Sequence, residues 1–293
     1  MKTDARETDS PAPAIDIGQQ SRADAEVRPL TWRIIRDQPR RAANNMALDH
    51  ALAACLADDH AVLRLYSWTR PTASFGRNEP TAGLYSAEAA NAQGIDYIRR
   101  PTGGRAVLHH GELTYAVIAP PRALGGVRNA YRLINQALAS ALQSLGAQVT
   151  VADGHQTLDL DAGPCFQAPA DGEVMANGRK LIGSAQARVE GALLQHGSII
   201  LTGDQTRLDL LRKPEPRAES PDHSTTDRTH QPATLFDQIG PVTPQQVGDA
   251  VADHMKKVFG GRWSEGEYSE RELLVADRLV DERYGRDEWT WRR

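Results

Sequence analysis

Cysteine is scarce in this chain: only Cys55 and Cys165 occur among its 293 residues. Two thiols are too few for the disulfide framework of a small secreted protein. No pair of histidines or cysteines has the spacing of zinc ligands, so we expect no metal. The two cysteines are therefore two packing thiols, or one packing thiol and one reactive thiol.

The sequence also lacks long apolar runs and a surplus of positive charge. No run approaches the roughly 20 apolar residues of a membrane-spanning helix, and the N-terminal stretch lacks the apolar core of a signal peptide. A net charge of -4 disfavours a protein that binds nucleic acid through its phosphates. We therefore expect a cytoplasmic protein that binds no membrane and no nucleic acid.

Two stretches have few of the large apolar residues that build a core. Residues 1–29 are polar and rich in Ser, Pro and Ala, so we expect a disordered tail. Residues 213–234 hold four prolines and many charges, which indicates a disordered insertion within a folded domain.

The remaining chain has the patterns of both strands and helices. Because these do not alternate strictly, an α+β fold is favoured over a doubly wound sheet. Asn177-Gly178 predicts a hairpin turn, since this pair favours positive φ. We expect strands at 30–37, 61–68, 94–100 and 112–120, a meander of short strands over 172–201, and helices at 44–58, 129–146, 243–260 and 269–285.

The segment RRPTGGRAVLHH, residues 99–110, gathers three arginines around two glycines. Gly103 and Gly104 have no Cβ, so a ligand can approach the backbone closely. Exposed N–H groups beside the arginines can hold a phosphate, a carboxylate or a developing oxyanion. A tight turn with solvated arginines explains the same residues, and the Gly-Lys-Ser/Thr of a Walker A loop is missing.

Cys165 stands in DAGPCFQAPADGEV, outside any helical or strand period. A thiol on such a loop is either a reactive group or a structural one, whereas Cys55 lies on the apolar face of an Ala-rich helix and is interpreted as a packing thiol. Lys180 begins the apolar stretch KLIGSAQA. It is either a surface residue with a buried stem or a positive charge directed into a cleft.

A third motif, LQHGSI, places His196 beside Gly197 and again suggests close approach to the backbone. This histidine, like His109 and His110, is ambiguous alone. A Ser-His-Asp triad remains open, although no Gly-x-Ser-x-Gly is present.

Together, RRPTGGRAVLHHGELTYAV, CFQAP and NGRKLIGSAQARVEGALLQHGSII resemble the catalytic domain of lipoate-protein ligases and biotin ligases. Within that family, the chain is similar to the octanoyltransferases with a catalytic cysteine and lysine. Cys165 precedes Lys180 by the fifteen positions of that branch, and Thr102 and Arg105 replace the serine and third glycine of the ligases. The resemblance covers residues 30–265 and leaves 266–293 as a helical extension.

The resemblance implies an α+β fold of the class II synthetase and biotin protein ligase type, with mixed, largely antiparallel sheets and packed helices. It implies transfer of an octanoyl group from octanoyl-acyl carrier protein to a lysine of a lipoyl-domain protein, such as the glycine cleavage H protein or a dehydrogenase E2 subunit, without a cofactor. Cys165 and Lys180 are the implied catalytic residues. The implied substrate-binding residues are Arg100, Thr102, Gly103, Gly104, Arg105, His109, Gly183, Ser184, Ala185, Gln195, His196, Gly197 and Ser198.

Two departures from the family pattern can alter donor or acceptor preference. His110 stands where such proteins often carry an acidic residue, and Asp171-Gly172 replaces an aromatic-containing stretch. We expect an arginine cluster to contact the acidic carrier. Its expected members are Arg99, Arg100, Arg105 and Arg188.

Three other functions stay open. An ATP-dependent lipoate ligase would use Lys180 on a carboxylate or phosphate and would not need Cys165. An amidotransferase between lipoyl proteins would use the same cysteine chemistry. A domain that only binds a carrier or lipoyl protein would need neither residue.

Overall fold

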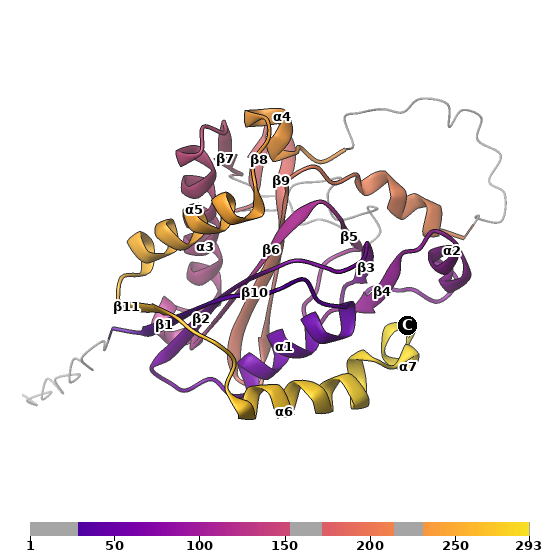
Figure 1. The fold of residues 1–293 in the computed structure, drawn as a ribbon, viewed down its shortest axis with the longest axis horizontal. Coiled ribbons are helices and arrows are strands. Elements are labelled where there is room, and N and C mark those ends of the chain that lie inside the picture. Colours follow the sequence, from indigo (N-terminus) through magenta and orange to yellow (C-terminus); the bar gives the residue numbers. More distant parts are fainter. Residues whose placement is uncertain (1–28, 153–171, 214–230, 293) are drawn as a thin grey trace, which may run out of the picture.

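The computed structural model describes residues 29–152, 172–213 and 231–292 (Figure 1). Its largest sheet contains, in spatial order, β11 (Arg262–Glu265), β1 (Thr31–Arg36), β2 (His60–Tyr66), β6 (Glu112–Ala119), β10 (Ala192–Ile200), β9 (Arg179–Val189), β8 (Val174–Ala176) and β7 (Val149–Val151). β1 runs parallel to β2 and β11, and the other neighbouring strands are antiparallel. This is the mixed, largely antiparallel architecture expected of the α+β class.

A smaller sheet lies beside the first (Figure 1). Its central strand, β3 (Thr72–Phe75), is parallel to β4 (Asp96–Arg99) and antiparallel to β5 (Val107–His109). Every residue of β3 and β5 is buried, so neither strand has the alternation of polar and apolar residues that marks a half-exposed strand. For this reason the sequence did not predict them.

Both faces of the large sheet are covered by helices (Figure 1). α3 (Val127–Ser144) and α5 (Pro244–Phe259) pack on one face, and α1 (Ala42–Ala54) with α6 (Glu270–Leu279) covers the other. Along β6, Tyr115 and Val117 join the core under α3, whereas Ala116 and Ile118 join the core under α1. Alternate side chains of β6 therefore pack into the hydrophobic cores on opposite faces of the sheet.

The predicted helices begin and end at recognisable signals. Capping boxes start α5 at Thr243 and α6 at Ser269. Gly146, with φ 98°, follows the end of α3, close to the end of the helix predicted over 129–146. The helix expected at 269–285 is α6 followed by a π-helical turn, Val280–Tyr284.

Two tight turns set the register of β8, β9 and β10. The predicted turn at Asn177-Gly178 is confirmed, with φ 49° and 73°. Glu190-Gly191 makes a second turn of the same kind, with φ 49° and 86°. β9 and β10 are longer than the short strands expected, and their pairing sets residues 183–185 opposite residues 196–198.

The rest of the described chain consists of short elements and connecting segments. Ala233, in the stretch predicted as an insertion, is buried and its N–H donates to the carbonyl of Lys180, so the packed domain resumes earlier than predicted. Residues 1–28 and 214–230 lie outside the described part. None of the described helices has the length and apolar character needed to cross a bilayer. The remaining elements are α2 (Ala87–Ala92), η1 (Pro121–Leu124), η2 (Gln205–Leu211), α4 (Leu235–Ile239) and α7 (Asp287–Thr290).

Gly76, which follows β3, lies against the loop that contains Gly103 and Gly104, called here the glycine loop. This contact leads to a prediction about stability. A Cβ atom at Gly76 would lie 1.7 Å from the carbonyl oxygen of Gly104, so Gly76→Ala must displace backbone. We expect a loss of at least about 2 kcal/mol in the free energy of unfolding, measured by urea denaturation. Gly103→Ala is the matched control, because its methyl group meets nothing within 4 Å. Equal stability of the two variants would contradict this view of the contact.

Candidate active site

The glycine loop after β4 is shaped by the buried side chain of Arg100. One guanidinium nitrogen, Nη1, donates to the carbonyl and hydroxyl oxygens of Ser74, at 2.6 and 2.7 Å. The other, Nη2, donates to the carbonyl oxygens of Gly103 and Arg105, at 2.9 and 3.0 Å. The arginine therefore turns the loop carbonyls inward.

The side chain of Arg99 binds the segment 76–81 and Thr290. Its guanidinium group donates to the carbonyl oxygens of Gly76, Glu79 and Thr290 and to the hydroxyl of Thr81. The exposed fraction is 0% for Arg99 and 4% for Arg100. The expectation that these two arginines face an acidic carrier is therefore wrong, because both guanidinium groups are buried against backbone oxygens.

The same geometry leaves donors on the loop. Within the described part of the chain, no acceptor binds the N–H of Gly103 or Gly104. Gly104 has φ 88°, and a Cβ there would lie 3.2 Å from Nη2 of Arg100. The loop thus has two N–H groups without a described acceptor, while the carbonyls of Thr102, Gly103 and Arg105 accept hydrogen bonds. An oxyanion-binding loop needs such N–H groups.

A narrow cavity brings the motifs together between α1, β10 and the small sheet. The space open to the centre of a water molecule is about 20 Å³. Eight predicted binding residues line it: Arg100, His109, Gly183, Ser184, Ala185, His196, Gly197 and Ser198. The sequence did not predict five others, Met46, Tyr66, Trp68, Val107 and Thr114, because their patterns indicate ordinary core.

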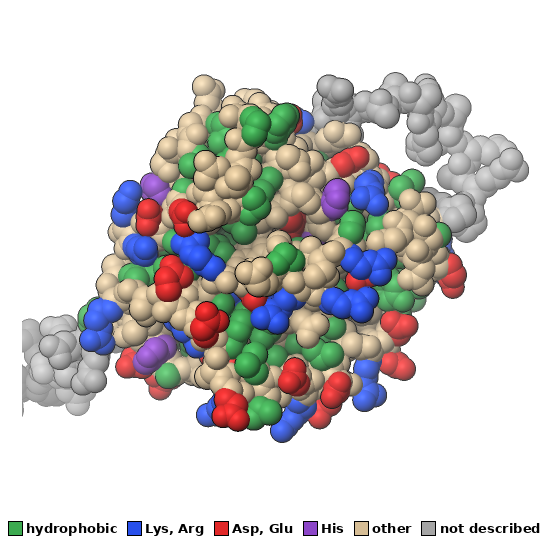
Figure 2. Space-filling model, in the orientation of Figure 1, with side chains coloured by type: hydrophobic (Ala, Val, Ile, Leu, Met, Phe, Trp, Pro, Cys, Tyr) green, Lys and Arg blue, Asp and Glu red, His purple; other side chains and the backbone are tan. Residues whose placement is uncertain are grey.

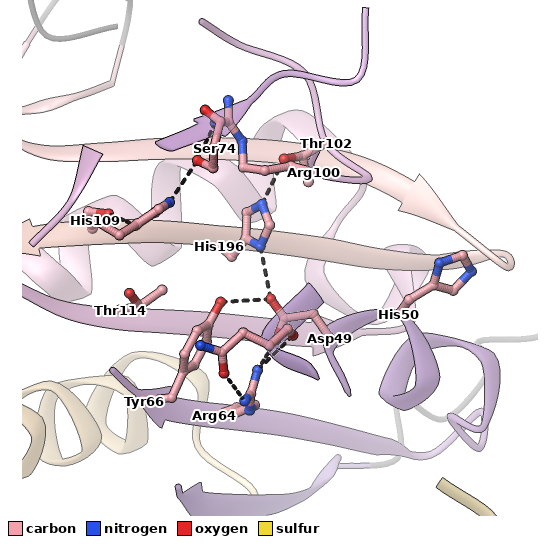
Figure 3. Close-up of polar contacts among 12 residues, drawn as sticks. Asp49, His50, Arg64, Tyr66, Ser74, Arg100, Thr102, His109, Thr114 and His196 are labelled. Carbon is pink, nitrogen blue, oxygen red and sulfur yellow. Dashed lines mark hydrogen bonds and ion pairs between the residues drawn. The ribbon is translucent and has the colours of Figure 1, made fainter. Parts of the chain in front are cut away.

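His196 is the centre of one buried hydrogen-bond chain (Figure 3). Its Nδ1 lies 2.9 Å from Oδ2 of Asp49, and its Nε2 lies 2.7 Å from Oγ1 of Thr102. Burial lowers the pKa of His196. The neutral ring then donates from Nδ1 to Asp49 and accepts at Nε2 from Thr102, which ties the loop to α1.

Asp49 is held as an anion by Arg64. Nη1 of Arg64 lies 2.7 Å from Oδ1 of Asp49, and the Tyr66 hydroxyl donates to Oδ2 at 2.9 Å. Burial alone would raise the pKa of Asp49, but the Arg64 charge and the hydrogen bond with His196 lower it below the ordinary value. The carboxylate can therefore fix the orientation of His196.

His109 forms a second chain with the same order of groups (Figure 3). Its Nδ1 lies 2.7 Å from Oε1 of Glu112, and its Nε2 lies 2.7 Å from Oγ of Ser74. The Trp68 ring stacks on the imidazole with centroids 4.1 Å apart, and Trp68 Nε1 donates to Thr114. The ring is therefore fixed on its edges and on one face.

Both chains have the composition of a catalytic triad, yet their hydroxyls are poorly placed for attack. Thr102 and Ser74 are buried and are not among the described residues lining the cavity. Ser74 Oγ also accepts a hydrogen bond from Arg100. The chains therefore orient imidazole rings on the cavity wall, and the geometry does not favour a hydroxyl nucleophile.

Lys180 lies at the start of β9, and its Nζ lies 2.5 Å from Oε1 of Glu173. Both residues are buried, and neither is among the described residues that line the cavity. Cys165, the predicted nucleophile, lies outside the described residues. Cys55 follows α1, and burial raises the pKa of its thiol, as suits an unreactive group.

Three other residues singled out in the sequence, Gln195, Arg105 and Arg188, are not among the described residues that line the cavity. Gln195 points to the opposite face of the sheet, where its Nε2 lies 3.1 Å from the Tyr115 hydroxyl. Arg105 is mostly buried, whereas Arg188 is exposed. On the face shown in Figure 2, basic and acidic side chains are interspersed. Within the described ranges, no group of three His, Cys, Asp or Glu side chains is arranged to hold a metal ion.

The family of the lipoyl protein ligase A/B catalytic domain matches residues 41–256. Octanoyltransferase LipM of Kyrpidia tusciae is 37% identical, with 90% of this chain and 99% of that protein covered. Octanoyltransferase LipM of Bacillus subtilis is 32% identical over the same shares. The alignment with each of these relatives spans nearly the whole of this chain and of the relative.

Two solved structures share the fold. The putative lipoate protein ligase Ta0514 from T. acidophilum with bound lipoic acid superposes with a TM-score of 0.75, at 22% identity, over 90% of this chain and all of that one. A lipoate-protein ligase A bound with ATP gives 0.74, also at 22% identity, over 89% and 99%. At this identity the likeness concerns the fold alone.

The hydrogen bonds of His196 with Asp49 and Thr102 predict the protonation state of its imidazole ring. We expect the ring to be mostly neutral at pH 6.5, with its proton on Nδ1, because burial lowers its pKa below this ordinary value and Asp49 accepts from that nitrogen. Histidine ¹⁵N NMR of the labelled protein reports both the charge and the tautomer. A mostly cationic ring at pH 6.5, or a neutral ring with its proton on Nε2, would contradict these hydrogen bonds.

The Asp49–Arg64 pair predicts a pH-dependent contribution to stability. Asp49→Asn breaks a fully buried ion pair, so we expect a loss of about 3–5 kcal/mol at pH 7. The folded-state pKa of Asp49 lies below the ordinary value of 3.8, so its contribution is present above that pH and is lost as the pH falls through the folded pKa. Urea denaturation of both proteins should show their difference shrinking below pH 3.8. A difference that is constant with pH would refute the assignment.

Proposed function

The chain belongs to the lipoyl protein ligase A/B catalytic domain family and is an octanoyltransferase, and we propose that its donor is octanoyl-acyl carrier protein and its acceptor a lysine of a lipoyl-domain protein. The observation that carries this proposal is that residues of the segments 99–110, 180–187 and 194–199 line one cavity beside a loop whose Gly103 and Gly104 N–H groups have no described acceptor. The relatives that align over almost the whole chain are named octanoyltransferases, which supports the octanoyl group as the group transferred.

The cavity is the proposed site of the acyl chain. Met46, Trp68, Val107 and Ala185 supply apolar wall, and burial of about seven methylene and methyl carbons at about 0.8 kcal/mol each is worth roughly 5 kcal/mol. The space present is too small for eight carbons, since about 20 Å³ suits one or two water molecules. Binding therefore requires lining side chains to move.

The proposed chemistry begins with Cys165. Its thiolate attacks the carbonyl carbon of the donor thioester, a new carbon–sulfur bond forms, and the carrier leaves as a thiol. A free cysteine has a pKa of about 8.5, and a nearby ammonium lowers it. Lys180 is the proposed ammonium, since the resemblance to the Cys/Lys branch pairs these two positions.

The second half transfers the acyl group to nitrogen. When the carrier leaves, its thiolate takes the proton of the Lys180 ammonium, so Lys180 becomes a neutral amine. The neutral amine of the acceptor lysine then attacks the acyl-enzyme, the amide bond forms, and Cys165 leaves as the thiolate. Lys180 is the proposed base that takes the amine proton, which restores the ammonium. Each tetrahedral intermediate carries a negative oxygen, for which the N–H groups of Gly103 and Gly104 are the proposed donors. One well-placed donor is worth about 2.7–4 kcal/mol.

Intact-protein mass spectrometry after mixing with octanoyl-acyl carrier protein, without ATP, tests the donor and the nucleophile. We expect an octanoyl adduct that hydroxylamine removes, and we expect Cys165→Ser to lose it, because an oxygen ester resists this treatment and a serine is not activated by an ammonium. Cys55→Ser is the matched control and should keep the adduct.

Other outcomes point to other activities. A protein that forms no adduct but acylates a lipoyl domain from octanoate with ATP and Mg²⁺ is a ligase. A protein that accepts octanoyl only from another lipoyl protein is an amidotransferase. A hydroxylamine-labile adduct in Cys165→Ser would refute the proposed nucleophile.

A further inference from the structure

Glu173 and Lys180 form a buried ion pair on the β8–β9 hairpin. Nζ of Lys180 and Oε1 of Glu173 are 2.5 Å apart, and the side chains are 2% and 5% exposed, respectively. Glu173 precedes β8 and Lys180 is the second residue of β9, on either side of the tight turn Asn177-Gly178. The contact therefore lies within one short hairpin.

The backbone on both sides of this pair is anchored. The carbonyl of Glu173 accepts from the N–H of Ala152, and the carbonyl of Lys180 accepts from the N–H of Ala233. The strand pairing shifts register between Val174 and Met175, as a β-bulge does. A bulge changes the direction of neighbouring side chains, and here the carboxylate lies against the lysine across the hairpin.

A buried ammonium is costly unless a carboxylate faces it. Desolvation favours the neutral amine, and an anion within hydrogen-bond distance favours the charged form. Two tyrosines, Tyr115 and Tyr131, lie on elements near the pair. Burial raises the pKa of the Tyr115 hydroxyl on β6 to about 12, the hydrogen bonds with Ser184 and Gln195 act in the opposite direction, and the Glu173 charge adds to the increase. Tyr131 on α3 packs against Gly172.

We propose that Glu173 is a positioning residue for the acyl transfer: its carboxylate fixes the Lys180 side chain in the buried hairpin and keeps it an ammonium while Cys165 is acylated. This inference rests on the proposed function, in which Lys180 activates Cys165. Glu173 forms no bond to substrate and moves no atom in either half-reaction. Its effect is electrostatic and geometric.

Single-turnover acylation of Cys165 by octanoyl-acyl carrier protein, followed over pH, tests this role. The rate should rise as the thiolate forms and fall as Lys180 loses its proton. In Glu173→Gln we expect the falling limb to move to lower pH. At any pH above the limb in both proteins, the rate should be about tenfold lower for each unit of that movement. A folded Glu173→Gln protein with the falling limb unmoved overturns the proposal.

Glu173→Asp separates charge from position. The shorter side chain keeps the anion, so the falling limb should stay in place, but the ammonium shifts and the rate should drop at every pH. Wild-type rates in this variant overturn the positioning role, and they do so even if Glu173→Gln fails to fold. Glu190→Gln is the matched control, because Glu190 lies at the far end of β9 and its side chain is 57% exposed. Its profile should equal that of the wild type.

Lys180→Met distinguishes failure of this inference from failure of the proposed function. Slow acylation in Lys180→Met, together with an unmoved limb in Glu173→Gln, refutes only the role of Glu173. Wild-type acylation in Lys180→Met refutes the proposed activation of Cys165, and the role of Glu173 with it.

Discussion

The candidate site depends on guanidinium groups that are buried and fully surrounded by acceptors. Arg99 and Arg100 bind backbone carbonyls, and Arg64 binds two carboxylates, those of Asp37 and Asp49. Removing such a group from water costs several kcal/mol, so each must be compensated by charged or carbonyl oxygens in good geometry. In this protein the compensation comes from segments far apart in the chain. The arginines therefore determine which loops lie together, and the cavity forms where those loops meet.

The two histidine chains extend this rigidity to the cavity wall. Each begins at a carboxylate, passes through an imidazole and ends at a hydroxyl on the small sheet or its loop. Because each ring is bonded through both nitrogens, it cannot rotate without breaking two hydrogen bonds. A wall built in this way holds donors and rings in place before a substrate arrives, which is how enzymes avoid reorganisation during the reaction.

The sequence allows the helices α1, α3, α5 and α6, the strands β1, β2, β4 and β6, and the Asn177-Gly178 turn to be predicted, because these follow from local periodicity and turn chemistry. It misleads at Arg99 and Arg100, whose acceptors, such as Ser74 and Thr290, cannot be paired with them from spacing. The sequence analysis places Gln195 and His196 in one binding set, although neighbouring residues on a strand point to opposite faces of the sheet. The alternation along the strand is therefore enough to separate Gln195 from the cavity. Met46 and Trp68 have the pattern of core residues, and only the packing shows that they border a cavity.

The bond between Arg99 and Thr290 also has a consequence for how the protein folds. The guanidinium group donates to a carbonyl 191 residues further along the chain, and the Trp289 ring donates a hydrogen bond to the Arg99 carbonyl. Closing so long a loop costs chain entropy, and contacts between residues far apart in sequence make folding slower. The glycine loop therefore cannot complete its geometry by local folding of residues 99–110, and its final shape requires the fold of the whole domain.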